Sequence, residues 1–164
     1  MSSSLLACDT PVLLYLERVG QAHLLPTLFE SVHVPEQVVE ELDMGRLLRI
    51  DTIDPRGLDR AVIVSPPDKD LDLLPPNRLG IGERAVIAHA LRTRGCWAGL
   101  DDLQARQLAA QLEVPVVGTL GILLRGKRVG LVDSVRLLLD RLWESGFHMS
   151  EDLYHEALRL AGEG

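Results

Sequence analysis

The sequence predicts an α/β fold in which helices cover both faces of a mainly parallel sheet. Short apolar runs with strand character alternate with longer amphipathic segments, and this alternation favours parallel strands joined through helices. The chain has 164 residues, of which 46% are hydrophobic, enough for one domain with a sizeable core. Because aromatic residues make up only 4% of the chain, we expect a core built mainly from Leu, Val, Ile and Ala.

The first part of the chain shows two strand signals separated by helical segments. In order, we expect a strand at 5–8, helices over 10–19 and 22–29, a strand at 31–34 and a helix from 35 onward. Thr10 is expected to be the N-cap of the first helix, Pro11 lies in its first turn, and Gly20 ends it. Residues 43–79 contain several proline breakers and form the least regular part. Within residues 43–79, only 61–64 has strand character.

The second half of the chain has clearer boundaries. After Gly80 we expect a helix over 83–94, a strand at 96–100, a helix over 103–112, a strand at 114–117 and helices near 120–128, 134–144 and 151–160. Gly95, Gly146 and Gly162 fall at expected helix ends, and Ser150 is a suitable N-cap for the last helix. The regular alternation supports a parallel sheet.

Several classes of protein do not fit the composition. No apolar run reaches membrane-spanning length, and the first residues lack the features of a signal peptide, so we expect a cytoplasmic protein. Cys8 and Cys96 fall in predicted buried strands, where we expect reduced core residues. The sequence has no CxxC pair and no metal-ligand spacing among its histidines, so a zinc site is not expected.

The charge distribution gives a mixed indication about nucleic acids. The net charge of −7 argues mildly against nonspecific binding, which basic surfaces promote. However, Arg125, Lys127 and Arg128 form a local basic strip. These side chains are candidates for holding a phosphate backbone, although for each one alone the solvated end of a helix is the simpler interpretation.

Acidic residues occur where the predicted strands end and where helices begin. Asp9 comes directly after the first strand, and Asp101 and Asp102 follow a later one. In an open α/β sheet, ligands bind at this carboxyl edge. Glu83 opens one helix and Glu41 lies on another. Clustered carboxylates with no cationic partner are typical ligands of Mg²⁺ or Mn²⁺, so we expect these acids to form a metal site.

Glu83 is the most informative of these acids because it begins the buried face of its helix. Val86, Ile87, Ala90 and Leu91 follow it at helical spacing. A glutamate in the first turn complements the helix dipole by about 0.3–1 kcal/mol. Burial of an unpaired ion costs several kcal/mol, which is more. Glu83 therefore either reaches solvent or meets a cation, and this residue alone does not decide between the two.

The other acids are less informative individually. Glu41 lies at the flank of its helix, where a charged side chain is usually solvated, and one of Asp101 and Asp102 is expected to cap the next helix. Asp9 is not required as a cap because Thr10 stands beside it. Together, like charges about 5 Å apart repel by roughly 3 kcal/mol at an effective dielectric near 20. Such a cluster requires a divalent ion or a shared proton, and metal-assisted hydrolysis of a phosphodiester suits it.

The acids lie in segments that resemble the PIN domain family. These segments are CDT at 8–10, VPEQVVEEL at 34–42, LGIGER at 79–84, LDD at 100–102, PVVGTLG at 115–121, RGKRVGL at 125–131 and GFHMS at 146–150. The resemblance extends over roughly residues 5–162, and the ordered set is much more specific than any one motif.

The resemblance implies one PIN-like domain over residues 1–164. Its fold would be a Rossmann-like, three-layer α/β/α sandwich with a mostly parallel sheet of about five strands. Its activity would be that of a Mg²⁺- or Mn²⁺-dependent endoribonuclease, related to VapC-type toxins of type II toxin–antitoxin pairs. The implied partners are an RNA substrate, a small antitoxin protein and a second copy of the chain, with no membrane.

The resemblance also assigns roles to residues. The implied catalytic acids are Asp9, Glu41, Glu83 and Asp101. The implied metal ligands are Asp9, Glu83 and Asp101, with Asp102 as an alternative because the register of the aspartate pair is ambiguous. Thr10 would support Asp9. A hydroxyl from Thr119 at the sheet edge is a further candidate, although a helix N-cap is the simpler role for that residue.

Two other function classes remain open. Small polar residues commonly follow the first Asp-Thr or Asp-Ser of the family, whereas here Pro11 follows and offers no donor. Pro11 and the acidic balance favour a non-catalytic PIN-like module that binds protein or RNA. A phosphoacceptor domain ranks third, because only Asp9 follows the first strand. The leucine-rich segment 135–143 either supports a homodimer or packs on its own core.

Overall fold

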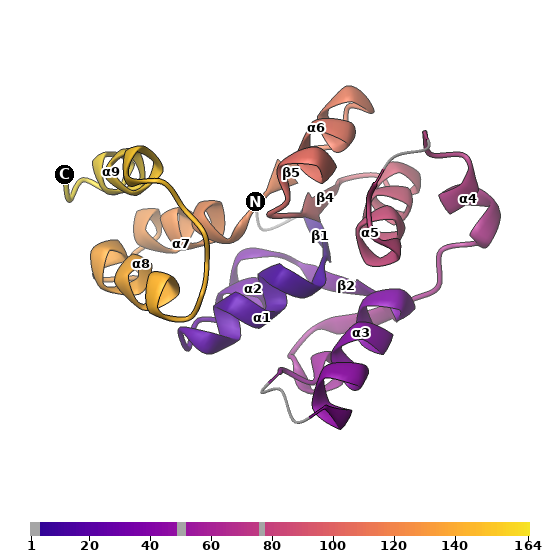
Figure 1. Ribbon diagram of the computed structural model, residues 1–164, viewed down its shortest axis with the longest axis horizontal. Helices are drawn as coiled ribbons and strands as arrows, with labels where there is room; N and C mark the ends of the chain where they lie inside the picture. Colours follow the sequence, from indigo (N-terminus) through magenta and orange to yellow (C-terminus); the bar gives the residue numbers. More distant parts are fainter. Residues whose placement is uncertain (1–3, 49–51, 76–77) are drawn as a thin grey trace.

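The computed structural model describes residues 4–48, 52–75 and 78–164, and a parallel sheet forms its centre (Figure 1). In this part of the chain five strands pair in the order β3-β2-β1-β4-β5, and every pairing is parallel. The strands are β1 (Leu5–Cys8), β2 (Ser31–Pro35), β3 (Ala61–Val64), β4 (Cys96–Gly99) and β5 (Val116–Val117). The predicted parallel sheet of about five strands is confirmed.

Helices connect the strands and pack on both faces of the sheet. They are α1 (Thr10–Arg18), α2 (Leu24–Leu28), α3 (Glu36–Leu47), α4 (Asp68–Asp72), α5 (Ile81–Arg92), α6 (Leu103–Gln111), α7 (Thr119–Arg128), α8 (Val135–Glu144) and α9 (Glu151–Leu160), with a 3₁₀ turn η1 at Pro55–Gly57. Figure 1 shows α1, α2 and α7 on one side of the strands and α5 on the other. Helices α7, α8 and α9 pack together. This is the predicted three-layer α/β/α sandwich.

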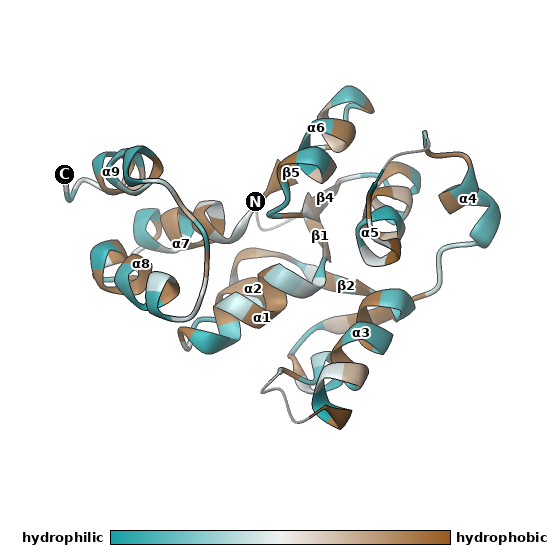
Figure 2. Ribbon diagram, in the orientation of Figure 1, coloured by the Kyte–Doolittle hydropathy of each residue, from teal (hydrophilic) through white to brown (hydrophobic). Residues whose placement is uncertain are grey.

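Apolar side chains gather on the strands and on the inward sides of the helices, as the hydropathy colouring shows (Figure 2). Leu6 of β1, Leu13 of α1, Ile87 of α5 and Leu123 of α7 have no exposed surface. Burial of each such side chain contributes roughly 1.5–3 kcal/mol. Within the described ranges, no helix is long and apolar enough to cross a membrane.

Two local expectations were wrong. Thr10 is not the N-cap of α1: Asp9 takes that position, without a side-chain capping bond, and Thr10 is the first helical residue. The reason is that the Thr10 hydroxyl hydrogen-bonds to Glu41 instead. The segment 43–79 also contains α4, a short helix that begins directly after Pro67 and that the surrounding prolines concealed.

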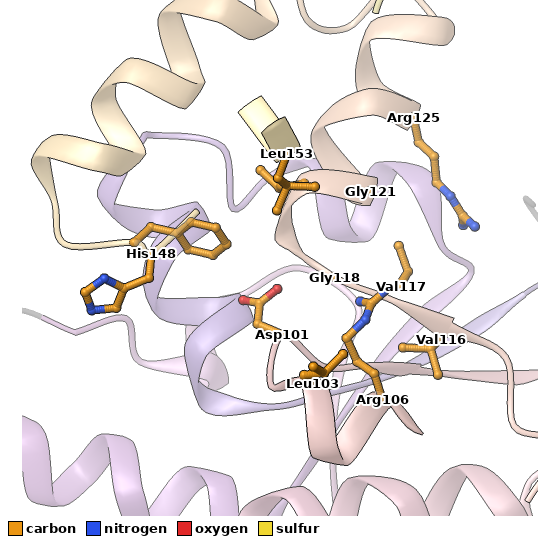
Figure 3. Close-up of a pocket in the computed structure, with 12 residues that line it drawn as sticks. Asp101, Leu103, Arg106, Val116, Val117, Gly118, Gly121, Arg125, His148 and Leu153 are labelled. Carbon is orange, nitrogen blue, oxygen red and sulfur yellow. The ribbon is translucent and has the colours of Figure 1, made fainter. Parts of the chain in front are cut away.

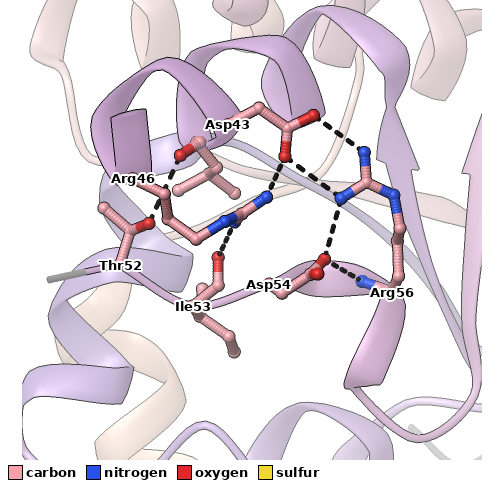
Figure 4. A network of polar contacts seen from close by, with 7 residues as sticks. Asp43, Arg46, Thr52, Ile53, Asp54 and Arg56 are labelled. Carbon is pink, nitrogen blue, oxygen red and sulfur yellow. Dashed lines mark hydrogen bonds and ion pairs between the residues drawn. The ribbon is translucent and has the colours of Figure 1, made fainter. Parts of the chain in front are cut away.

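The C-terminal half of α3 is fixed by a network of charged side chains (Figure 4). Asp43 forms ion pairs with Arg46 and, at 2.8 Å, with Arg56, which also reaches Asp54 at 3.0 Å. The Arg56 hydrogen bond is the main cause that lowers the pKa of Asp43. The network joins α3 to the segment that leads to β3. It therefore helps to position the helix that carries Glu41.

Candidate active site

Four carboxylates converge at the carboxyl edge of the sheet. β1 and β4 are neighbours, and the backbone N–H of Asp9 donates to the carbonyl oxygen of Gly99 at 3.1 Å. Asp9 and Asp101 therefore follow paired strands and leave the sheet at the same edge. Glu83 approaches from the first turn of α5, and Glu41 approaches from α3.

Asp9 is the buried centre of this cluster, with 3% of its surface exposed. Burial raises the pKa of Asp9 from 3.8 to about 8; a hydrogen bond from the backbone of Thr10 opposes the shift, and the charges of Glu83, Glu41 and Asp101 add to it. All three of the other acids thus lie within electrostatic reach of Asp9. Without a cation, its carboxyl group retains a proton at neutral pH.

Gly82, in the first turn of α5, leaves the space in which Glu41 and Asp9 meet. A Cβ atom at Gly82 would overlap with Glu41 Oε1 and would lie 3.1 Å from Asp9 Oδ1. Thr10 supports both acids: its Oγ1 donates to Glu41 Oε2 at 2.9 Å, and its backbone N–H bonds to Asp9. The expected support of Asp9 by Thr10 therefore comes from the backbone, while the hydroxyl orients Glu41.

Asp101 is held by Thr119, the first residue of α7. Thr119 donates from its backbone N to Oδ1 and from its Oγ1 to Oδ2, each at 2.7 Å. Burial raises the pKa of Asp101, whereas these two hydrogen bonds and the charge of Arg106 oppose the shift. Gly118, not Thr119, occupies the N-cap of α7. The threonine hydroxyl is consequently directed at the acid and not at its own helix.

Glu83 caps the start of its helix and also lies within electrostatic reach of other acids. Its Oε1 accepts a 3.1 Å hydrogen bond from the backbone N–H of Gly80 and so completes the start of α5. Burial raises the pKa of Glu83; the Gly80 bond opposes this, and the charges of Asp102 and Glu41 add to it. The helix-start interpretation and the cluster interpretation therefore describe the same half-buried side chain.

Asp102 is turned away from the centre of the cluster. Its Oδ2 accepts from the backbone N–H of Ala105 at 3.0 Å and caps α6, and its side chain is exposed. Among the causes that shift the pKa of Asp9, the charge of Asp101 appears and that of Asp102 does not. Of the aspartate pair, Asp101 is therefore the one whose charge acts on Asp9, whereas the charge of Asp102 acts on Glu83.

The donor set consists of carboxylate oxygens, which suit a hard divalent cation. Among the described residues, no group of three His, Cys, Asp or Glu side chains is placed to hold an ion as it stands. Glu41, Glu83 and Asp101 are each directed at a hydrogen-bond donor of their own. Because Asp9 is buried among three acids and its pKa is strongly raised, the chemistry of the cluster nevertheless fits such a cation.

A pocket of about 500 Å³ adjoins the acidic cluster (Figure 3). It is lined by Asp101, Leu103, Arg106, Val116, Val117, Gly118, Leu120, Gly121, Arg125, Phe147, His148 and Leu153. Arg106 donates from Nη1 to the carbonyl oxygen of Leu100 at 2.9 Å. A Cβ atom at Gly118 would lie 2.6 Å from that Nη1 and 2.8 Å from Asp101 Oδ1. Glycine at this position therefore lets Arg106 and Asp101 lie side by side.

The three basic residues of the sequence strip do not share one surface. Arg125 lines the pocket beside Asp101, and its guanidinium lies 4.4 Å from the ring centroid of Trp97. Lys127 donates to the carbonyl oxygen of Asp133 at 2.6 Å and forms an ion pair with Glu163 at 3.4 Å. Lys127 and Arg128 line a different hollow. Of the three, only Arg125 lines the pocket that Asp101 also lines.

Sequence reasoning did not single out Arg106, and it included Gly82 and Phe147 only as members of the segments that resemble the family, without a role in the site. One signal was available for Arg106: it follows Asp102 by four residues, one turn into a helix that begins at the acidic edge. For Phe147 the resemblance of the segment 146–150 was the only signal, because its place beside the pocket depends on how the connection between α8 and α9 returns to the sheet.

The comparisons with known proteins agree with the fold. No curated protein matches the chain. A family model described as a PIN domain matches residues 5–163, which is nearly the whole chain. PIN domains are a nuclease fold whose members are typically metal-dependent. The resemblance seen in the sequence is confirmed, and the chain belongs to the PIN domain family.

Proposed function

We propose that this protein is a metal-dependent endoribonuclease that uses Mg²⁺ or Mn²⁺. The observation that carries the proposal is the convergence of three acids on the buried Asp9, whose pKa is raised to about 8. The Thr10 hydrogen bond alone does not offset this shift, and a bound cation would stabilise the charged form of the group further. The cluster lies at the carboxyl edge of a parallel sheet, where α/β proteins bind ligands.

Asp9, Glu83 and Asp101 are the residues that would hold the ion. A bound divalent ion stabilises negative charge on a phosphodiester and makes water a stronger nucleophile. Asp9 gives up its proton at the carboxylate, and Thr119 keeps both oxygens of Asp101 in one orientation. Glu41 is held by the Thr10 hydroxyl and would orient water at the edge of the cluster.

Pro11 is compatible with this role. It lies within the first turn of α1, where a backbone N–H has no helical partner in any case. The backbone donor that Asp9 uses belongs to Thr10, which Pro11 does not affect. The departure from the family pattern therefore removes none of the contacts described for Asp9.

Replacement of Asp9 tests the proposal. We expect Asp9→Asn to abolish cleavage of RNA in Mg²⁺ or Mn²⁺, because the charge of the central ligand is lost while its size is kept. Asp59→Asn, at an exposed position outside the cluster, is the matched control and should cleave like the wild type. Cleavage by purified Asp9→Asn, or by the wild type in excess EDTA, would exclude the proposed mechanism.

A non-catalytic PIN-like module is the second candidate. It is favoured by the observation that Glu41, Glu83 and Asp101 each accept a hydrogen bond from within the chain. Such a module would bind RNA or a protein without cutting it. Binding of RNA by the wild type, together with no cleavage in either metal ion, would support this candidate over the nuclease.

We further propose that residues 1–164 form one domain that acts in the cytoplasm as the toxin of a type II pair. Family membership supports this role. The test is expression in a bacterial host. The wild type should arrest growth, Asp9→Asn should not, and co-expression of a small open reading frame adjacent to the gene should restore growth. A wild type that leaves growth unaffected would contradict the toxin role.

A homodimer is also part of the proposal, but helix α8 does not support it. Leu138, Leu139 and Leu142 of α8 are buried in the chain's own core. Of the exposed apolar side chains, Leu137 and Trp143 lie on α8, whereas a larger group lies on or directly after α3 and on the edge strand β3. The larger group consists of Met44, Leu47, Leu48, Val62 and Ile63. A second copy of the chain that covered these residues would remove apolar surface from water.

A further inference from the structure

We propose that the pocket beside Asp101 is a nucleotide subsite, which receives one base of a single-stranded RNA next to the phosphodiester at the acidic cluster. This inference rests on the proposed function and deepens it. It concerns how the substrate is held and not how the bond is broken.

The pocket is placed where a base next to the reacting phosphate would lie. Its walls come from the start of α6, from β5 and α7, and from the connection between α8 and α9. Figure 3 shows Asp101 and Leu153 on opposite walls, with Arg106 and Arg125 toward one side and His148 toward the other. Asp101 belongs to both the pocket and the acidic cluster. A ligand in the pocket is therefore a direct neighbour of the proposed reaction centre.

The dimensions and walls of the pocket suit a flat, partly apolar ring. Its volume of about 500 Å³ lies within the range of roughly 300–1,000 Å³ typical of small-ligand sites. Leu103 is 66% exposed and Leu153 is 44% exposed, although both are apolar. Bases of single-stranded RNA are recognised by such surfaces, since they can leave the stack and enter a pocket.

The charges beside these apolar walls favour a ligand that carries phosphate. Arg106 and Arg125 both line the pocket, and a guanidinium group is suited to phosphate in charge and geometry. Arg125 is partly buried, and both burial and the nearby charge of Arg128 lower its pKa. An anion at Arg125 would relieve this repulsion. The carboxylate of Asp101 is meanwhile engaged by Thr119.

A second hollow extends the pocket and indicates a strand in preference to an isolated small molecule. It has a volume of about 380 Å³ and shares Phe147 and His148 with the first pocket. Trp143 also lines this hollow; it is 40% exposed and stacks on Tyr154, with the ring centroids 4.5 Å apart. Exposed aromatic rings are common platforms for successive bases. The two hollows together offer places for two consecutive nucleotides.

The inference is tested by measuring RNA binding under conditions in which cleavage does not occur. Fluorescence anisotropy with a labelled single-stranded RNA of mixed sequence, in EDTA at low salt, reports affinity without metal. Leu153→Glu places a negative charge on the pocket wall and should weaken binding about tenfold or more. Leu137→Glu, on α8 and 50% exposed but outside both hollows, is the matched control and should bind like the wild type.

A second pair of variants removes positive charge. Arg125→Ala should weaken binding, whereas Arg141→Ala, exposed on α8, should not. Unlabelled nucleoside 5′-monophosphates should compete with the labelled RNA for the wild type and compete less well for Leu153→Glu. Thermal melting verifies that every variant is folded. If either Leu153→Glu or Arg125→Ala is unfolded, the RNA affinity of the other pocket variant tests the inference.

The outcomes separate this inference from the proposed function. Equal affinity of both pocket variants and their controls, or no binding of RNA by the wild type in EDTA, would overturn the subsite even if the enzyme cleaves RNA. Loss of binding in the pocket variants, combined with no cleavage in Mg²⁺ or Mn²⁺, would support the subsite and contradict the nuclease. Competition by an uncharged apolar peptide but not by nucleotides would overturn the inference in favour of a protein ligand.

Discussion

Thr119 holds both oxygens of Asp101, through its backbone N and its Oγ1, at 2.7 Å each. The two residues follow neighbouring strands, because Asp101 comes after β4 and Thr119 comes after β5. The pairing of these strands continues to the edge, where the N–H of Leu100 donates to the carbonyl oxygen of Val117 at 3.0 Å. The orientation of one acid in the cluster therefore depends directly on the register of the sheet.

Replacing Thr119 by valine should change how the Asp101 side chain is oriented without changing its charge. Thr119→Val keeps the backbone donor but removes the Oγ1 donor, so the buried Oδ2 loses its partner. We expect the free energy of unfolding to fall by about 1–2 kcal/mol, and RNA cleavage to fall without disappearing. Thr27→Val, which removes a hydroxyl that donates to the carbonyl oxygen of His23 at the start of α2, is the control for loss of a threonine hydroxyl. Cleavage that stays at the wild-type level in Thr119→Val would show that Asp101 needs no such support.

Gly82→Ala should disturb the site while favouring the helix that contains it. Alanine in a helix is more stable than glycine by roughly 0.5–1 kcal/mol. The added methyl group would overlap with Glu41 and approach Asp9 to 3.1 Å. We therefore expect loss of cleavage and a smaller Mg²⁺-dependent rise in melting temperature. Gly57→Ala, where a Cβ meets nothing within 4 Å, should leave both measurements unchanged. A Gly82→Ala protein that cleaves normally would contradict the proposed role of Glu41.

The position of the acids after paired strands is the part of the site that a sequence can predict. Parallel strands end at one edge, so Asp9 and Asp101 are brought together by the alternation of strands and helices alone. The sheet and its helices were predicted for the same reason, and the boundaries of β3 and α9 agree residue for residue. A periodic apolar pattern extends over many residues, so it predicts a helix or strand even where one or two residues are ambiguous.

The contacts between side chains were not predictable in the same way. The Thr10 hydroxyl could cap α1 or reach across to α3, and only the tertiary position of Glu41 decides this. Which aspartate caps α6 likewise depends on the rotation of the chain after β4, which turns Asp102 toward Ala105. The spacing of Arg106 from Asp102 places it near the acidic edge, but its hydrogen bond to the backbone carbonyl group of Leu100 has no sequence signature.

The apolar surface of α3 and β3 provides a test of the proposed dimer. Ile63→Lys places a charge on the edge strand, where the wild-type side chain is 41% exposed. If a second copy covers this surface, the mass measured by light scattering should change from that of a dimer to that of a monomer. Leu73→Lys, at an 82% exposed leucine after α4, is the control and should not change the mass. A wild-type monomer over a wide concentration range would rule the dimer out.

His33 of β2 and His89 of α5 should make the fold sensitive to acid. His33 Nδ1 and His89 Nε2 are 2.8 Å apart, so at least one ring must be neutral to accept a hydrogen bond. Burial lowers the pKa of His33, and burial followed by the charge of His33 lowers that of His89. Their contribution to stability is present above the unfolded-state pKa near 6.5 and is lost as pH falls through the lower folded-state values.

Urea unfolding between pH 5 and 7.5 measures this effect. His89→Gln should reduce the loss of stability on acidification, because a neutral amide replaces a ring that must otherwise gain a proton. His23→Gln, at an exposed site, is the control and should follow the wild type. Identical pH dependence in the wild type and His89→Gln would show that the histidine pair is not responsible for acid sensitivity.

Asp9 should produce the opposite pH dependence in metal-free protein. Its pKa is raised from 3.8 to about 8 in the folded state, so the folded protein retains a proton that the unfolded chain releases. The resulting stability is complete below about pH 4 and is lost as pH rises through about 8. We therefore expect that, in EDTA, the free energy of unfolding measured in urea decreases from pH 7 to pH 9. Asp9→Asn should show a flatter profile and be at least as stable at pH 9, because its amide never ionises.

Addition of Mg²⁺ should counteract this loss, because an ion that binds only the folded state stabilises it by RT ln(1 + [Mg²⁺]/Kd). The melting temperature of the wild type at pH 8 should therefore be higher in millimolar Mg²⁺ than in EDTA, and the pH profile should become flatter. Asp9→Asn should lose most of this metal effect while keeping the fold, since Glu41, Glu83 and Asp101 then lack their shared central partner. If the wild type melts at the same temperature in EDTA and in Mg²⁺, the four acids do not form a metal site.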